Sequence, residues 1–215
     1  MIITAHTGAD HTPKNTRLFL SKMKKVPLQA IEMDIRKSGN IIYCKHDKSI
    51  MPFLKLRLKY VLDYVVKRNI LINLDLKSFG LVKDVAALVK ACGAENNVYY
   101  TGSVGADEFE YLGKAKVYLN LAFIEQCCPL TVENVGKIKE YVDSFKCENV
   151  GGINVNYKFA SEELLSECKK QGLKVSLFTV DDIDELKRLL NHDELVNITT
   201  KKISCALSLA NQIRK

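Results

Sequence analysis

Two kinds of apolar segment alternate along almost the whole 215-residue chain. Short runs typical of buried strands are each followed by a longer segment with apolar residues at helical spacing. Strict alternation predicts a parallel sheet, because consecutive parallel strands need a crossover between them. The expected strands span residues 2–6, 29–35, 70–76, 98–101, 116–122, 152–155, 173–180 and 195–199. The expected helices span residues 15–25, with Pro13 setting the first turn, and 52–68, 81–92, 107–112, 132–145, 161–170, 183–190 and 203–213.

Eight such units predict an α/β protein with a closed (β/α)8 barrel, formed by residues 1–215 as one domain. An open, doubly wound sheet is the alternative arrangement of the same units. The site of a barrel is built by the loops that follow the strands, so we expect functional residues at the carboxyl ends of strands.

The second expected strand carries two acids within an apolar run. Glu32 and Asp34 are two positions apart, so their side chains lie on one face of the strand. Two buried carboxylates side by side repel each other unless a cation lies between them. The acids in residues 105–116, by contrast, are interpreted as a solvated helix face.

The third expected strand ends in Asp75 and Lys77, which also share one face. Three carboxylates, without histidine or cysteine pairs at ligand spacing, favour a hard cation such as Mg²⁺ or Ca²⁺ over Zn²⁺. Lys77 is placed to neutralise charge on a phosphate in the transition state. A Schiff-base lysine is the alternative, which the neighbouring acids disfavour because they keep the ammonium protonated.

Two histidines are expected to flank this site. His6 ends the first strand, and His46 follows a Ser38-Gly39-Asn40 turn and a short apolar run. One histidine that accepts a proton and another that donates one are what phosphodiester cleavage requires.

Composition limits the partners of the chain. Net charge is +7, yet the basic residues are scattered lysines without interleaved aromatic residues, so we expect no nucleic-acid partner. Seven unevenly spaced cysteines form neither a disulfide framework nor a zinc signature and favour a reducing, cytoplasmic location. We expect no secretory signal and no stable membrane anchor, and the sequence leaves the oligomeric state open.

These residues resemble the glycerophosphodiester phosphodiesterase family, whose motifs occur in order along nearly the whole chain. The family's His-Arg-Gly and Pro-Glu-Asn-Thr are similar to His6-Thr7-Gly8 and Pro13-Lys14-Asn15-Thr16. Its Glu-x-Asp, His-Asp and Glu-x-Lys are similar to Glu32-Met33-Asp34, His46-Asp47 and Asp75-Leu76-Lys77. Its Trp-Thr-Val-Asn and Ile-Thr-Asp-x-Pro are similar to Phe178-Thr179-Val180-Asp181 and Ile198-Thr199-Thr200-Lys201.

The resemblance implies a TIM barrel of the phospholipase-C-like phosphodiesterase type that hydrolyses glycerophosphodiesters to sn-glycerol 3-phosphate and an alcohol. It implies a divalent metal held by Glu32, Asp34 and Asp75, with His6 and His46 as acid/base pair and Lys77 at the phosphate. We further expect Thr7 and Lys14 at the phosphate, and Asn120, Phe178 and Thr179, which lie toward the carboxyl ends of expected strands, in the substrate pocket.

The chain departs from the family pattern in four ways. Thr7 replaces an arginine, and losing such a charge-assisted contact, worth about 1.5–3 kcal/mol, weakens phosphate binding by roughly one to two orders of magnitude. Lys14 replaces a glutamate and is hypothesised to restore the lost positive charge. Asp75 replaces a glutamate, which is similar to the sphingomyelinase D relatives that cyclise their substrates. Asp75 also follows Asp47 closely, leaving little or no insertion after the second strand.

Two alternatives therefore stand beside hydrolysis. One is an enzyme of the same fold that cyclises a different phosphodiester. The other is a catalytically silent barrel that binds a phosphorylated ligand, favoured by Thr7 and Lys14 and disfavoured by the three acids.

Overall fold

The computed structural model describes residues 1–213, and over these residues eight parallel strands close a barrel. The first and last strands pair with each other, and the first also pairs with the second, so the sheet has no open edge between them. The predicted (β/α)8 barrel is therefore confirmed over the open-sheet alternative. The barrel strands are β1 (Ile2–Ala5), β2 (Ala30–Ser38), β5 (Leu71–Leu76), β6 (Val98–Gly102), β7 (Lys116–Asn120), β8 (Val150–Asn156), β9 (Val175–Phe178) and β10 (Leu195–Thr200).

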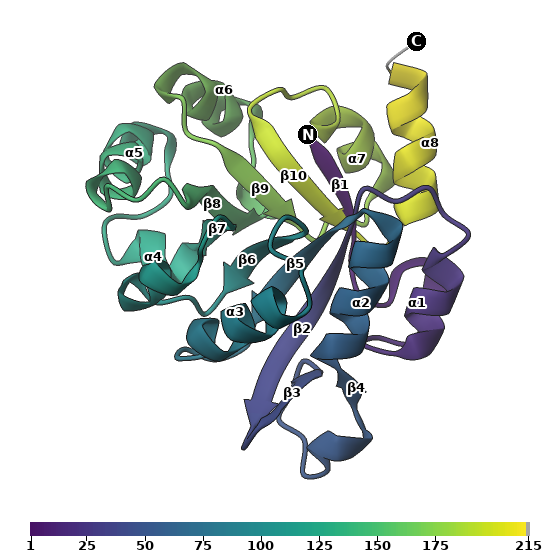
Figure 1. The fold of residues 1–215 in the computed structure, drawn as a ribbon. Helices are drawn as coiled ribbons and strands as arrows, with labels where there is room; N and C mark the ends of the chain where they lie inside the picture. The colour runs from purple at the N-terminus through teal and green to yellow at the C-terminus, as the bar shows by residue number, and fades with distance from the viewer. Residues whose placement is uncertain (214–215) are drawn as a thin grey trace.

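Helices surround the barrel on its outside (Figure 1). The α-helices are α1 (Arg17–Met23), α2 (Leu58–Arg68), α3 (Val82–Ala91), α4 (Leu121–Glu125), α5 (Val135–Ser144), α6 (Glu162–Gln171), α7 (Ile183–Leu189) and α8 (Ile203–Ile213). The short 3-10 helices are η1 (Ala9–His11), η2 (Pro52–Leu54), η3 (Ala106–Tyr111), η4 (Val132–Asn134) and η5 (Tyr157–Phe159). Among the described residues no helix is both long enough and apolar enough to span a lipid bilayer.

Three expected helices differ from the structure. The helix expected over 15–25 begins only at Arg17, because Thr16 caps it by accepting a hydrogen bond from the Phe19 N–H. Asn15 lies outside it with a positive φ of 56°. The helix expected over 107–112 is η3, a 3-10 helix, so the crossover from β6 to β7 contains no α-helix.

The helix expected over 52–68 begins only at Leu58, because the preceding residues pair with a short strand instead. β2 runs past the barrel rim and turns back as β3 (Ile41–Cys44), and β4 (Leu56–Arg57) then pairs with β3. This antiparallel extension projects from the barrel in Figure 1 and carries the loop with His46. β3, η2, β4 and the loops that join them make up the whole segment between β2 and α2.

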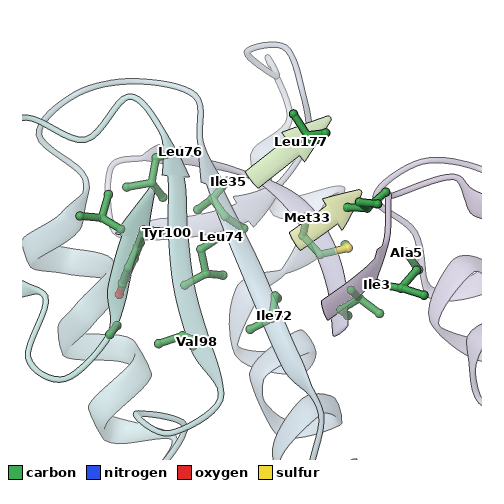
Figure 2. Packing of buried hydrophobic residues seen from close by; sticks show 14 of the residues in the cluster. Ile3, Ala5, Met33, Ile35, Ile72, Leu74, Leu76, Val98, Tyr100 and Leu177 are labelled. Atoms are coloured by element: carbon green, nitrogen blue, oxygen red, sulfur yellow. The ribbon is translucent and has the colours of Figure 1, made fainter. Parts of the chain in front are cut away.

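Successive strand residues face opposite sides of the barrel wall. The outward residues form the apolar core beneath the helices, as Ile72, Leu74 and Leu76 do on β5 (Figure 2). The inward residues are largely polar and bond across neighbouring strands, as in Thr4 to Asn197 (2.6 Å) and Ser176 to Asn154 (2.8 Å). Since buried polar groups need partners, this network fixes the inward side chains beneath the site.

Candidate functional site

The three acids predicted to act together lie together at the carboxyl ends of β2 and β5. Asp34 is directly opposite Asp75 in the parallel register, and Glu32 is two residues before Asp34 on the same inward face. One carboxylate oxygen from each lies within 4.8 Å of the others. Glu32 and Asp34 are buried, and Asp75 is half-buried. Like charges at this separation need compensation by a cation or a proton.

Glu32 has an unsatisfied oxygen. Its Oε2 accepts a hydrogen bond from the Thr7 N–H at 2.9 Å, whereas its Oε1 is buried without any partner among the described residues. Burial, followed by the charges of Asp34 and Asp75, raises the pKa of Glu32 well above its ordinary value. An orphaned buried carboxylate oxygen beside two other carboxylates suits a cation ligand.

Lys77 supplies part of the compensation. Its Nζ lies 2.8 Å from Asp34 Oδ1 and 2.6 Å from Asp75 Oδ2, so the ammonium bridges two of the acids. Burial alone would lower the pKa of Lys77, but the two carboxylates raise it above its ordinary value. When all three carboxylates are ionised, as metal binding requires, they and the ammonium together carry a charge of −2, which one divalent cation would neutralise. The donor set therefore fits Mg²⁺ or Ca²⁺, both of which prefer carboxylate oxygens.

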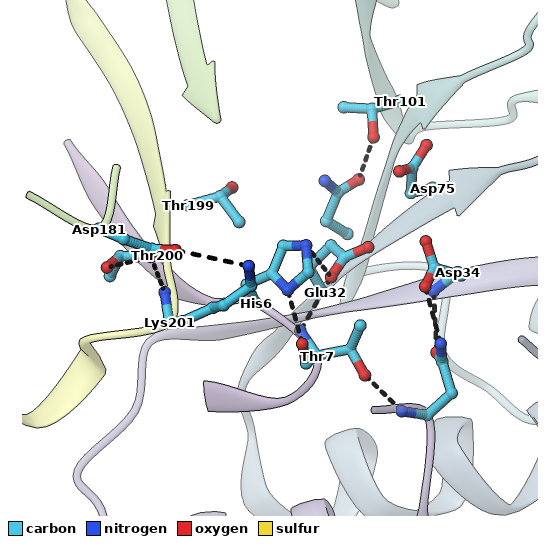
Figure 3. Close-up of polar contacts among 12 residues, drawn as sticks. His6, Thr7, Glu32, Asp34, Asp75, Thr101, Asp181, Thr199, Thr200 and Lys201 are labelled. Carbon is cyan, nitrogen blue, oxygen red and sulfur yellow. Dashed lines mark hydrogen bonds and ion pairs between the residues drawn. The ribbon is translucent and has the colours of Figure 1, made fainter. Parts of the chain in front are cut away.

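Of the two predicted histidines, His6 lines the same pocket as Glu32 and Asp75. His6 Nε2 lies 3.9 Å from Glu32 Oε2, and His6 Nδ1 lies 2.6 Å from the Thr7 carbonyl oxygen (Figure 3). Burial lowers the pKa of His6, although the hydrogen bond to Thr7 opposes this change. His6 is therefore a neutral ring at neutral pH.

His46 does not line the pocket, although its charge lowers the pKa values of Asp34 and Asp75. Its side chain is 64% exposed, and Nδ1 lies 2.9 Å from Asp47 Oδ1. The position lies beyond the barrel rim on the loop after β3, where side-chain direction is not set by the barrel. The backbone is nevertheless close, since the N–H of the preceding residue, Lys45, donates to the Asp34 carbonyl oxygen at 2.9 Å.

Thr7, predicted at the phosphate, does not face the pocket. Its side chain is fully buried, and its hydroxyl accepts a hydrogen bond from the Asn15 N–H at 2.5 Å. Asn15 in turn donates from Nδ2 to Asp34 Oδ2 at 2.7 Å, which helps Lys77 to hold the pKa of Asp34 below its ordinary value although burial opposes it. Thr7 thus acts on the site through Asn15. The sequence analysis gave Asn15 no role in the site, and its one indication was that asparagine tolerates a positive φ in the turn after Pro13-Lys14.

Two lysines lie close to His6. Lys14 is exposed, and its side chain lies against Gly8. Lys201 belongs to a quoted motif but received no role from the sequence. It donates its N–H to Asp181 Oδ1 at 2.7 Å, and its ammonium lies 3.5 Å from Asp181 Oδ2. In Figure 3 the Lys201 side chain extends toward His6. After burial, the charge of Lys201 and then that of Lys14 contribute to the lowered pKa of His6.

A pocket of about 240 Å³ at the carboxyl ends of the strands contains His6, Glu32, Asp75 and Lys77. Asn120, Phe178 and Thr179, the predicted pocket residues, all line it. Asn120 Oδ1 accepts hydrogen bonds from the Gly102 N–H (3.2 Å) and from Asn154 Nδ2 (2.9 Å), so its orientation is fixed. The remaining lining residues are His6, Glu32, Asn73, Asp75, Leu76, Lys77, Thr101, Gly102, Ser103, Asn154 and Thr199.

Gly102 leaves the room that Asp75 occupies. Its φ is +86°, and a Cβ there would collide with the Asp75 carboxylate and the Leu76 carbonyl oxygen. We expect Gly102→Ala to lower the free energy of unfolding by about 1–3 kcal/mol or more in urea denaturation, and to displace Asp75. Gly113→Ala is the matched control, because its φ is +62° but no atom obstructs its Cβ. Equal losses in the two variants would show that the collision with Asp75 has no effect.

Comparison with known proteins gives the fold. No protein-family model and no curated protein matches the sequence. A glycerophosphodiester phosphodiesterase from Agrobacterium tumefaciens superposes with a TM-score of 0.72 at 15% identity, covering 98% of this chain and 99% of that one. The enzyme of the same name from Parabacteroides distasonis gives 0.73 at 15%, covering 100% and 98%. The chain shares their fold.

A third solved structure has the same fold. It is an Oleispira antarctica phosphodiesterase in complex with the product sn-glycerol-3-phosphate, with a TM-score of 0.75 at 16% identity, covering 98% of this chain and 97% of that one. At these identities the similarity establishes the barrel and its strand order.

Proposed function

We propose that the chain is a divalent-metal-dependent phosphodiesterase that hydrolyses glycerophosphodiesters to sn-glycerol 3-phosphate and an alcohol. The observation that carries this proposal is the orphaned Glu32 Oε1 beside Asp34 and Asp75, in the same pocket as His6. The motif resemblance and the fold shared with glycerophosphodiester phosphodiesterases support the substrate class.

Glu32, Asp34 and Asp75 would hold Mg²⁺ or Ca²⁺, and the bound ion would stabilise negative charge on the phosphoryl oxygens. Lys77, whose ammonium bridges two of these acids, would contact the phosphate once a divalent cation shares its carboxylates. Asn120, Phe178 and Thr179 would contact the rest of the substrate from the opposite side of the pocket.

His6 would act as the proton acceptor. Because Nδ1 lies 2.6 Å from the Thr7 carbonyl oxygen, the ring proton of neutral His6 resides on Nδ1 and leaves Nε2 with a free lone pair. Nε2 is the atom that faces Glu32 and can take a proton from the attacking water. His46, turned inward about its side-chain torsions, would give a proton to the leaving alcohol oxygen.

Positive charge at the phosphate would come from Lys14 and Lys201, in place of the family's arginine at position 7. We expect Lys14→Ala and Lys201→Ala each to raise the KM for glycerophosphocholine by about tenfold, since a hydrogen bond to a charged group is worth about 1.5–3 kcal/mol. The measurement is steady-state kinetics beside Lys67→Ala, an exposed lysine on α2. An unchanged KM in both variants would contradict this role.

Phosphorus NMR of the reaction with glycerophosphocholine tests the function and separates it from the alternatives. Attack by water gives sn-glycerol 3-phosphate, whereas attack by a substrate hydroxyl gives a cyclic phosphate. A cyclic product would favour the alternative suggested by Asp75, an enzyme that cyclises its phosphodiester substrate. If neither product forms although the phosphodiester binds, the catalytically silent barrel is favoured.

We propose that this activity belongs to the cytoplasm. All seven cysteines are free in the structure, including the adjacent pair Cys127 and Cys128, whose sulfur atoms lie 3.6 Å apart. Free thiols are retained in reducing compartments.

A further inference from the structure

A second cavity, of about 610 Å³, lies on the outside of the barrel. It extends over the outer face of β6, between α3 and the turn that follows η3. The crossover from β6 to β7 contains a six-residue 3-10 helix instead of an α-helix, so the layer outside β6 is incomplete beside α3. We call this cavity the β6 groove. No residue that lines it lines the pocket with His6.

The rim of the β6 groove is positively charged. Lys83 and Lys90 come from α3, Lys114 from the turn after η3, and Glu95 is the only acid among the lining residues. Within residues 1–213 none of the three lysines pairs with a carboxylate. Lys83 Nζ lies 5.5 Å from the Tyr111 ring centroid, which is a cation–π contact. Three ammonium groups without carboxylate partners on one rim complement an anion.

The floor of the groove is apolar, with one polar group. Val98 and Tyr100 lie on the same face of β6 (Figure 2), beside Ala86 and Ala87 of α3 and Leu112. Tyr100 is only 1% exposed, and it is one of the residues that line the groove. Burial alone raises the pKa of the Tyr100 phenol. The phenol therefore keeps its proton and can donate a hydrogen bond.

The two walls are held together before any ligand arrives. Glu108, expected on a solvated face, is buried, and its carboxylate accepts hydrogen bonds from three backbone N–H groups: Val82 (2.9 Å), Gly80 (3.1 Å) and Gly105 (3.1 Å). These bonds join the start of α3 to the start of η3. A preformed cavity loses less free energy to ordering when a ligand binds.

We propose that the β6 groove binds a single-chain anionic amphiphile. The alkyl chain would lie on the floor of Val98, Ala86 and Ala87, and the phosphate or carboxylate head group would contact the lysines, with the Tyr100 hydroxyl as an additional donor. The volume is within the range of small-molecule sites, about 300–1,000 Å³. A flat aromatic ligand fits less well, because Tyr111, the exposed ring of the groove, already carries Lys83 over it.

The test is isothermal titration calorimetry of the full chain with dodecyl phosphate and dodecanoate below their micelle concentrations. The controls are dodecyl maltoside, which has the same chain and no charge, and inorganic phosphate, which has no chain. We expect both anionic amphiphiles to bind at least about tenfold more tightly than either control. Whichever anion binds more tightly identifies the head group as phosphate or carboxylate.

Variants locate the binding. We expect Ala87→Trp, which fills the groove from an exposed position, to abolish binding, and Ala91→Trp on the same helix outside the groove to leave it unchanged. The double variant Lys90→Ala, Lys114→Ala should weaken binding at least about tenfold. The control double variant Lys24→Ala, Lys67→Ala should leave the affinity unchanged. Equal affinity in Ala87→Trp, or equal binding of the neutral maltoside, would overturn the proposal. Circular dichroism confirms that each variant is folded, and since the groove shares no residue with the site of His6, failure here leaves the proposed hydrolysis untouched.

Discussion

Replacing His6 with alanine is expected to lower kcat by about a hundred- to ten-thousand-fold, the usual contribution of a positioned acid or base. His6 is the histidine that lines the pocket, and burial lowers its pKa so that the ring is neutral and can accept a proton. Within residues 1–213 the ring makes one hydrogen bond, to the adjacent Thr7 carbonyl oxygen, so its loss should leave the barrel folded. Steady-state kinetics with glycerophosphocholine, beside circular dichroism, measure the two effects.

His11→Ala is the matched control, because His11 lies five residues away on an exposed 3-10 turn. We expect its kcat to equal that of the parent chain. A His6→Ala variant that retains more than about a tenth of the parent kcat would remove His6 from the proton transfer. His46→Ala tests the second histidine in the same assay, and a similarly large loss would show that His46 turns toward the substrate during the reaction.

The second large effect is expected from Glu32→Gln. Glutamine has nearly the same shape and keeps an oxygen for the Thr7 N–H, but it removes one of three neighbouring negative charges. In the metal-free protein at neutral pH we expect the free energy of unfolding to rise by about 1–3 kcal/mol, the usual cost of an uncompensated buried polar group. We also expect the stabilisation by Mg²⁺ or Ca²⁺, about 2.7 kcal/mol at one hundred times Kd, to disappear.

The pH dependence of this gain follows from the sign of the pKa change. Burial, Asp34 and Asp75 raise the pKa of Glu32 in the folded protein, so the unfolded chain loses this proton at lower pH than the folded one. Ionisation of Glu32 therefore destabilises the metal-free fold above the unfolded pKa of about 4.3 and has no effect below it. The difference between Glu32→Gln and the parent should consequently vanish as the pH falls below about 4.

Glu108→Gln separates this effect from the loss of any buried carboxylate. Glu108 is also buried, but its oxygens accept three backbone N–H bonds, so we expect this variant to be less stable than the parent and still stabilised by the metal. Urea denaturation with and without each ion measures the free energy of unfolding of the parent, of Glu32→Gln and of Glu108→Gln. A metal-free Glu32→Gln protein that is less stable than the parent at neutral pH would show that the charge of Glu32 is already compensated.

Local patterns predicted the barrel and the acidic cluster, because both follow from periodicity. Alternating strands and helices require parallel strands, and a spacing of two places Glu32 and Asp34 on one face. The register of β2 and β5 then brings Asp75 opposite Asp34. None of these steps depends on contacts between distant side chains.

Distant contacts decided what the sequence could not predict. Thr7 faces Asn15 instead of the pocket because its hydroxyl completes a hydrogen-bond chain to Asp34. The expected helix over 52–68 loses its first turns to strand pairing with β3, a tertiary interaction that overrides local propensity. His46 lies on this extension beyond the rim, where strand alternation no longer dictates the direction of a side chain.

The central claim is that Glu32, Asp34 and Asp75 hold a divalent ion that supports phosphodiester hydrolysis. Its most direct test is the release of sn-glycerol 3-phosphate from glycerophosphocholine and glycerophosphoethanolamine with Mg²⁺, with Ca²⁺ or with excess chelator. We predict turnover with at least one of the two ions, lost on chelation and in Glu32→Gln. Turnover that persists undiminished in excess chelator, or no release with either ion from the folded protein, would contradict the claim.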